Sequence, residues 1–316
     1  MHPAYSVIFF TTASGAGFGM LALLGVLGPL GVLPRDPLFG LAALALSLGA
    51  AGAGLVASTF HLGRPERAWR AFSQWRTSWL SRVGVASVAT YVPATLFAIG
   101  WVFFGSPGGP WAVFGLLAAA GALASIWCTA MIYRSLKTIQ RWANPWVPPN
   151  YFALAFMTGA LWLDFLLAAF GRLATPFAWV AAGLVLLGAA LKLGYWRHID
   201  RTRSVSTAES ATGLGGFGKV RLFEAPHTEE NYLLKEMGYR VARKHAARLR
   251  LIALLLGFAV PLALTLLLLL VGSGLGAALL GLAAAAAATA GVLVERWLFF
   301  AEAKHTVTLY SGAATA

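Results

Sequence analysis

Long apolar segments alternate with short polar connections along almost the whole chain. Eight of the segments are long enough to cross the hydrocarbon core of a bilayer, which needs about 20 residues of α-helix. We expect spans near 6–30, 38–60, 82–104, 110–133, 151–171, 175–196, 249–272 and 275–299. The first lacks the basic start and cleavage site of a signal peptide, so we interpret it as a span. The pattern predicts an all-α, polytopic membrane protein with eight transmembrane helices in an antiparallel bundle.

Composition supports this class. Of the 316 residues, 59% are hydrophobic and only 11% are charged, and the mean hydropathy is +0.73, far from a soluble protein. The single cysteine, Cys128, lies in the fourth span. It excludes an intrachain disulfide and a cysteine-ligated cluster within this chain.

We divide the chain into three parts. Residues 1–196 carry the first six spans with the loop 61–81, 197–248 form a cytoplasmic loop and helix, and 249–316 carry the last two spans and the tail. Hydrophobic residues at i, i+4 spacing predict an amphipathic helix over 228–248. This helix could lie on anionic lipid or under a partner subunit.

The net charge of +13 is unevenly distributed between the loops. The loops 61–81, 134–150 and 197–248 hold most of the arginines and lysines, whereas the opposite loops hold only Arg35 and Arg172. This asymmetry predicts that both termini and the basic loops are cytoplasmic. Orientation thus explains the charge without nucleic acid. The same face could dock an acidic partner, and our candidates are Arg67, Arg70, Arg76, Arg134 and Arg141.

The loop after the second span carries the densest chemistry. His61 stands where the apolar segment ends, followed by Arg64 and Glu66. A quinone head group needs a hydrogen-bond donor that exchanges protons near neutral pH, which an interfacial histidine supplies. We therefore expect a quinone site at His61, with Arg64 as a second donor and Glu66 as a proton carrier. Alternatively, His61 is an interfacial anchor and Arg64 extends to the headgroups. The tryptophans of this loop are typical of an aromatic belt.

Polar residues within the spans are further candidates. The hydroxyls of Thr11 and Ser14 could contact the quinone, although hydrogen bonds back to their own helix are the simpler account. Asp164, in the fifth span, is a candidate for proton transfer, because carboxylates within membranes are commonly functional.

Three charged residues lie near the cytoplasmic ends of later spans. We expect Lys192 to extend its amine to the cytoplasmic surface. We expect Glu295 and Arg296 to pair with each other or with loop arginines.

Histidine positions argue against haem, whose axial ligands would face each other within the spans. All six histidines fall in loops, at termini or at span ends: His2, His61, His198, His227, His245 and His305. We therefore expect no haem and no metal in this chain, and a mobile quinone, menaquinone or ubiquinone, as the electron carrier.

Several segments together resemble the dimethyl sulfoxide reductase anchor subunit family. They are HPAYSVIFFTTASGAG, STFHLGRPERAWRAFSQWR, MIYRSLKTIQRWANPWVPP, HTEENYLLKEMGYRVARKHA and ERWLFFAEAKHTV. The resemblance implies an eight-span anchor without haem, whose partners are an iron–sulfur electron-transfer subunit and a molybdopterin catalytic subunit. It implies that His61 is the histidine of the quinol site. Family members often carry a glutamate where this chain has Val83, which makes Glu66 the substitute candidate for proton transfer.

These observations predict a membrane anchor and quinone-reactive subunit of a molybdopterin oxidoreductase complex, with no catalytic centre of its own. The predicted cytoplasmic position of His61 favours a sulfite:quinone oxidoreductase, because the resemblance implies that anchors of sulfite-oxidising complexes serve a cytoplasmic enzyme. The alternative is a quinol-oxidising anchor of a dimethyl sulfoxide reductase. A transporter and a purely structural anchor are more remote possibilities, and the spans show few charged residues of the kind a transporter uses.

Overall fold

The computed structural model describes residues 4–60, 62–173, 175–202, 206–224, 245–311 and 313. Within these ranges the chain is helical and has no β-strand, and eight helices are long and apolar enough to cross a membrane. They are α1 (Tyr5–Leu27), α2 (Pro37–Ala57), α3 (Trp79–Phe104), α4 (Trp111–Arg134), α5 (Val147–Ala169), α6 (Thr175–Arg201), a seventh span in three pieces, and α12 (Leu275–Ala301). The predicted all-α fold with eight spans is confirmed.

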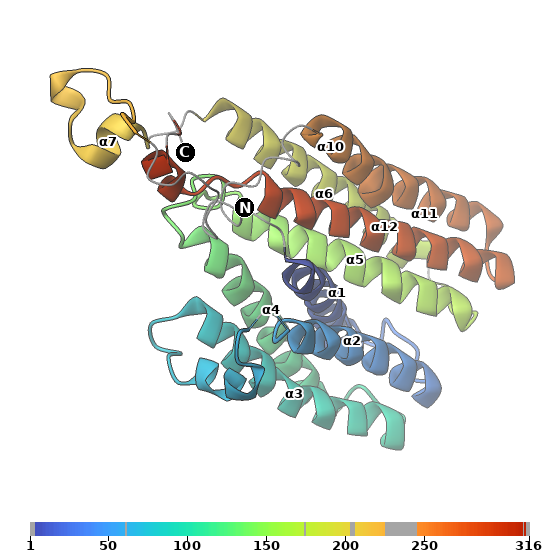
Figure 1. The fold of residues 1–316 in the computed structure, drawn as a ribbon. Coiled ribbons are helices and arrows are strands. Elements are labelled where there is room, and N and C mark those ends of the chain that lie inside the picture. The colour runs from blue at the N-terminus through green and yellow to red at the C-terminus, as the bar shows by residue number, and fades with distance from the viewer. Residues whose placement is uncertain are drawn as a thin grey trace.

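Helices α1 and α5 form the centre of the bundle. In each of these two helices, 72% of the most apolar 18-residue stretch is buried within the protein. The corresponding share is 28–44% in the other six spans. Figure 1 shows α2, α3 and α4 on one side of this central pair, and α6, α11 and α12 on the other. The central pair is therefore where a buried polar site can be enclosed by protein on all sides.

Small residues set the contacts between helices. Gly17 of α1 packs on Ala51 of α2, and the hydroxyl of Ser47 donates to the Gly17 carbonyl at 2.9 Å. Farther along α2, Gly54 packs beside Ser14, so α1 and α2 run in opposite directions. Backbones approach this closely because glycine has no side chain, as is common between membrane helices.

The seventh span contains a π-helical turn. The span consists of α10 (Ala246–Leu254), a π-helix (Leu255–Ala259) and α11 (Val260–Val271). Pro261 lacks a backbone N–H and disrupts regular α-helical hydrogen bonding just after this turn. Within the turn, Gly257 crosses Gly291 of α12 at backbone contact.

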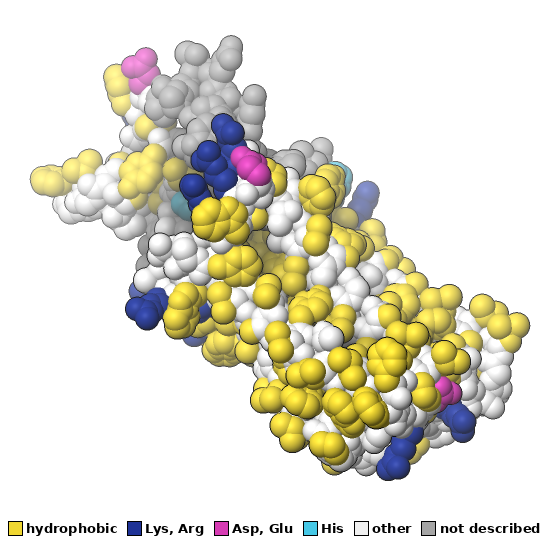
Figure 2. Space-filling view, turned by 90° about the horizontal axis from the view of Figure 1, so that it is seen from below, with side chains coloured by type: hydrophobic (Ala, Val, Ile, Leu, Met, Phe, Trp, Pro, Cys, Tyr) yellow, Lys and Arg dark blue, Asp and Glu magenta, His cyan; other side chains and the backbone are white. Residues whose placement is uncertain are grey.

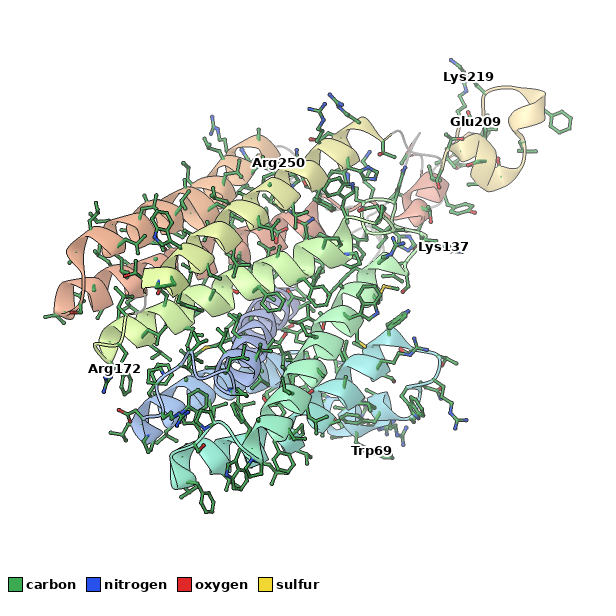
Figure 3. The ribbon with its side chains drawn as sticks, turned by 180° about the vertical axis from the view of Figure 1, so that it is seen from behind. Trp69, Lys137, Arg172, Glu209, Lys219 and Arg250 are labelled. Atoms are coloured by element: carbon green, nitrogen blue, oxygen red, sulfur yellow. The ribbon has the colours of Figure 1, made fainter. Side chains whose placement is uncertain are left out.

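The two ends of the bundle differ in their connections. One end, which we call the basic end, is formed by the described residues within 58–78, 135–146, 202–224 and 302–313. Figure 3 shows Trp69, Lys137 and Lys219 at this end and Arg172 at the opposite, short-loop end. Figure 2 shows one face on which hydrophobic side chains cover the middle and Lys and Arg side chains gather toward the ends.

Short helices lie in the loops of the basic end. A 3₁₀-helix, η1 (Pro65–Phe72), lies in the loop before α3. Helix α7 (Ala208–Thr212), which begins at a capping box on Thr207, projects from the bundle in Figure 1. The predicted amphipathic helix over 228–248 lies mostly outside the described residues, and its last three residues belong to α10.

Candidate functional site

The loop after α2 lies at the surface of the basic end. Helix α2 ends at Ala57, and the chain turns through 58–60 before η1. His61 falls outside the described residues. Arg64 and Glu66 are described and are exposed, at 74% and 60% of their side-chain areas, with Nη1 and Oε1 3.9 Å apart. Both side chains are therefore exposed, and both residues lie close to His61 in the sequence.

Arginine–tryptophan contacts organise the rest of this loop. Arg70 lies over Trp69, Arg76 over Trp75 and Arg82 over Trp79, at 5.5, 5.5 and 4.2 Å from the ring centroids. Arg82 also donates to the carbonyls of Trp75 and Arg76, at 3.0 and 2.6 Å. These contacts hold cations and aromatic rings together at the basic end.

The five candidate docking arginines differ in accessibility. Arg67, Arg70 and Arg76 are exposed, whereas Arg134 is half-buried. Arg141 is also partly buried, and its Nη1 lies 3.7 Å from Oε2 of the buried Glu302. The exposed part of this set therefore lies on the loop 58–78.

The hydroxyls predicted in the first span lie inside the bundle. Thr11 donates to the carbonyls of Val7 and Ile8 at 3.0 and 3.1 Å, and Ser14 donates to Phe10 at 2.6 Å. Back-bonding to the helix is therefore observed for both residues.

Both hydroxyls also line an internal cavity. It lies between α1, α4, α5 and α12, and its lining includes Thr12, Tyr151 and Arg296. Its volume is about 10 Å³, room for about one water molecule. Arg64 is not among its lining residues, so the structure does not bring Arg64 together with Thr11 and Ser14.

A cluster of buried charges lies beside this cavity. Lys192 of α6 pairs with Glu295 of α12, and Arg296 Nε lies 3.3 Å from the other oxygen of Glu295. All three side chains are at most 3% exposed. The expected pairing of Glu295 with Arg296 is confirmed. The expectation that Lys192 reaches the surface is wrong, because α6 turns this residue toward α12, where Glu295 supplies a counter-charge inside the bundle.

Aromatic rings enclose the two cations. The Arg296 guanidinium lies 3.8 Å from the ring centroid of Tyr151, and the Lys192 amine lies 4.2 Å from that of Tyr195 and 5.1 Å from that of Trp196. Cation–π attraction of this kind offsets part of the cost of removing a cation from water. We refer to Lys192, Glu295 and Arg296 as the buried triad.

A second ionic group lies between the buried triad and solvent. Arg250 of α10 donates to both oxygens of Asp200, at 2.6 and 3.0 Å, and to both oxygens of Glu302, at 3.1 and 3.2 Å. This arginine therefore joins α6, α10 and the end of α12. The group was missed from the sequence, although Asp200 and Glu302 are among only 11 acidic residues and both stand at span ends.

Asp164 lies elsewhere in the bundle. Its side chain is buried in α5 toward the short-loop end, and Oδ1 has no hydrogen-bond partner. One turn away, Ala168 belongs to the same hydrophobic cluster as Leu268 of α11. Thr265, one turn before Leu268 and also without a partner for its hydroxyl, therefore lies at a similar depth.

Two apolar hollows open on the lipid-facing surface. One lies between α3 and α4, has a volume of about 440 Å³ and is lined by residues such as Pro93 and Phe114. The other lies between α1, α10 and α12, has a volume of about 360 Å³ and is lined by residues such as Ile8 and Trp297. Either could accept a hydrocarbon tail.

The comparisons with known proteins agree with this architecture. Residues 1–302 match the family described as DMSO reductase anchor subunit (DmsC). A sulfite dehydrogenase subunit from Allochromatium vinosum is 37% identical over 329 aligned positions, covering 98% of both proteins. A subunit of the anaerobic dimethyl sulfoxide reductase of Escherichia coli is 28% identical over 123 positions, covering 35% of this protein and 38% of the relative. The eight-span fold and a match over nearly the whole length together show that the protein belongs to the dimethyl sulfoxide reductase anchor subunit family.

Proposed function

We propose that this protein is the membrane anchor and quinone-reactive subunit of a sulfite-oxidising molybdopterin complex. It receives electrons from an iron–sulfur subunit and passes them to a membrane quinone, either menaquinone or ubiquinone. The observation that carries this proposal is the similarity to a sulfite dehydrogenase subunit over 98% of both proteins. The similarity to the dimethyl sulfoxide reductase relative extends over 35% of this protein, so it supports the reverse reaction, quinol oxidation, less well.

The partner subunits bind at the basic end. The exposed Arg67, Arg70 and Arg76 lie there with Trp69 and Trp75. Arginine and tryptophan are enriched at protein interfaces, and the positive charge attracts an acidic partner. Because basic loops stay on the cytoplasmic side of bacterial membranes, this end faces the cytoplasm and both termini lie there.

The quinone head group binds at His61. The imidazole donates a hydrogen bond to a quinone carbonyl and supplies a proton as the ring is reduced. Arg64, whose Nη1 lies 3.9 Å from Oε1 of Glu66, serves as a charged donor to the head group. The exposed Glu66 exchanges protons with water. Thr11 and Ser14 line the cavity on α1, which Arg64 does not line. They therefore contribute to the quinone site from this cavity and not from a position beside Arg64.

To test this proposal, the complex is purified through an affinity tag on this protein, and its sulfite-dependent reduction of quinone is measured. Iron, molybdenum and two further subunits should co-purify with it. We expect His61→Ala to lower sulfite-dependent quinone reduction by about 10- to 100-fold, the effect of losing a hydrogen bond to a charged or proton-transferring group. Sulfite oxidation with a soluble dye should stay unchanged, because that reaction bypasses the anchor.

His245→Ala is the control, since His245 is an exposed histidine at the same end. It should leave both activities at the wild-type level. Unchanged quinone reduction in His61→Ala would refute the site, and absence of iron and molybdenum from the isolated complex would refute the function.

A further inference from the structure

The apolar hollow between α1, α10 and α12 lies where these helices reach the basic end. Tyr5 begins α1, Leu249 is in the first turn of α10, and Trp297 is one turn before the end of α12. Tyrosine and tryptophan are common at the level where the hydrocarbon of a bilayer meets the lipid head groups. The hollow is therefore at the interface of the membrane and not at its centre.

The size and lining of the hollow suit a hydrocarbon chain. Helices α1 and α10 both pack on α12, which lies between them in Figure 1, so α12 forms the floor. The volume of about 360 Å³ is in the range of ligand pockets, about 300–1,000 Å³. The lining residues, none of which is charged, are Tyr5, Ile8, Leu249, Leu293, Val294 and Trp297.

A cation flanks this hollow on α10. Arg250 faces α6 and α12, where it pairs with Asp200 and Glu302. Successive residues of an α-helix are about 100° apart, so Leu249 faces the hollow between Arg250 on one side and Arg248 on the other. Arg248 is exposed, and none of the ion pairs among the described residues involves it. Its guanidinium is therefore available to an anion beside the hollow.

The start of α1 adds to the positive potential at this rim. The first backbone N–H groups of a helix have no partner within the helix and carry partial positive charge. Ala4, the N-cap of α1, offers these groups no side-chain acceptor, and neither α1 nor α10 has an acidic residue in its first turn. An anion at the rim of the hollow would therefore meet positive charge from both helices.

At the second apolar hollow, between α3 and α4, the nearby cation is already engaged. Arg82 is one turn before Ala86, a residue of that lining. Its guanidinium donates to the carbonyls of Trp75 and Arg76 and lies over the ring of Trp79. The second hollow thus offers a similar apolar lining without a cation available to a head group, which makes it a natural comparison.

We propose that the hollow between α1, α10 and α12 binds an anionic phospholipid from the leaflet at the basic end. One acyl chain occupies the hollow, and the phosphate group binds the Arg248 guanidinium at its rim. Basic pockets between the helices of membrane proteins bind anionic head groups in this way. A quinone has an uncharged head group and gains nothing from this cation, so the charge favours the phospholipid. This binding needs only the membrane-embedded chain, with or without partner subunits.

Thermal unfolding of the full-length protein, purified in detergent and stripped of lipid, tests the site. A lipid that contacts three helices binds only the folded protein and so raises its melting temperature. We expect phosphatidylglycerol, added in mixed micelles, to raise the melting temperature by about 3–5 °C near saturation. Phosphatidylcholine, which has the same acyl chains but no net charge, should raise it far less.

Substitutions of arginine test the recognition of charge. Arg248→Ala should weaken the binding of phosphatidylglycerol by about fivefold, the contribution of one cation near an anionic lipid surface. Arg248→Lys keeps the charge and should retain most of the binding. Arg197→Ala, at an exposed arginine of α6, is the control and should bind like the wild type. Native mass spectrometry measures the fraction of protein that retains the lipid, and without lipid all three variants should melt like the wild type.

Substitutions that fill the hollows test the place of the acyl chain. Leu249→Trp fills the proposed site and should abolish stabilisation by phosphatidylglycerol. Leu117→Trp is the matched control, because it fills the hollow between α3 and α4 and should leave the stabilisation unchanged. Where Leu249→Trp does not fold, the Arg248 variants still decide, since that residue is exposed.

Three results would overturn the proposal. Equal stabilisation by phosphatidylcholine and phosphatidylglycerol would show that the hollow takes any acyl chain without recognising an anion. A wild-type response of Arg248→Ala would place the head group elsewhere. Stabilisation by a quinone, with no response to phosphatidylglycerol, would assign the hollow to a quinone tail.

Discussion

Each buried charged residue at the basic side of the bundle has a specific partner. Lys192 and Glu295 pair directly, Arg296 lies between Glu295 and the Tyr151 ring, and Glu302 accepts from Arg250. Removing one member of a buried pair leaves a charge without compensation, which costs far more than the pair contributes. These residues therefore constrain one another, and their roles have to be separated by substitutions that preserve charge balance.

Arg250→Ala tests the ionic group that joins α6, α10 and α12. We expect the unfolding free energy in detergent to fall by about 1–2 kcal/mol. This is below the value for a fully buried pair, because Asp200 is half exposed and Glu302 keeps Arg141 nearby. Thermal unfolding of the purified protein measures the change. Arg248→Ala, an exposed arginine two residues away on the same helix, should leave the melting temperature unchanged. Equal melting temperatures for the two variants would contradict the role assigned to Arg250.

At the scale of helices, small residues decide which elements meet. Gly19 of α1 packs on Ala155 of α5, and Gly159 packs on Met20, so the two central helices run in the same direction at backbone contact. Lipid competes for apolar side chains as well as protein does, so close backbone packing rather than hydrophobicity selects these contacts. The same reasoning applies where Gly257 in the π-helical turn crosses Gly291.

Gly159→Leu tests the central crossing. A Cβ at this position would lie 2.9 Å from Met20 Cα, within the α1 backbone, so the helices must separate. Overpacking of this kind costs about 1–3 kcal/mol. We expect a lower melting temperature and poor assembly with partner subunits. Gly183→Leu is the matched control. Gly183 is an exposed residue of α6, and a Cβ at this position would have no neighbouring atom within 4 Å. A Gly159 variant as stable as the Gly183 variant would show that this crossing is adaptable.

At the scale of the whole molecule, the basic end and the short-loop end are chemically distinct. The basic end combines the loop 58–78, the ion pairs of Arg250 and the exposed arginines, and the triad lies behind it within the bundle. The opposite end consists of short connections such as 105–110 and 272–274. Docking, quinone chemistry and proton entry therefore share one face in our proposal, which keeps electron transfer distances short.

Cysteine labelling in whole cells tests the orientation. In a Cys128→Ala background without partner subunits, we expect a membrane-impermeant maleimide to label Arg172→Cys in intact spheroplasts. Lys137→Cys should react only after the membrane is opened, because basic loops remain cytoplasmic. Both positions are exposed, so accessibility within the protein is comparable. The reverse labelling pattern would place the basic end in the periplasm and overturn the docking proposal.

The amino-acid sequence by itself determined the eight spans and the asymmetry of charge between the two ends. Both are linear properties: the length of an apolar run and the count of arginines in each loop need no knowledge of packing. The pairing of Glu295 with Arg296 was also predictable, because the two residues are adjacent in the sequence. His61 was singled out by its position at a span end, and its contacts lie outside the described residues.

Only the tertiary structure decided what the charged residues within the spans do. Lys192 and Glu295 are far apart in the sequence, and nothing in the apolar run around Lys192 shows that α6 turns it inward toward α12. The cavity between Thr12, Tyr151 and Arg296 likewise depends on how α1, α5 and α12 cross. These arrangements depend on how separate helices pack against one another, a three-dimensional condition that local hydropathy does not encode.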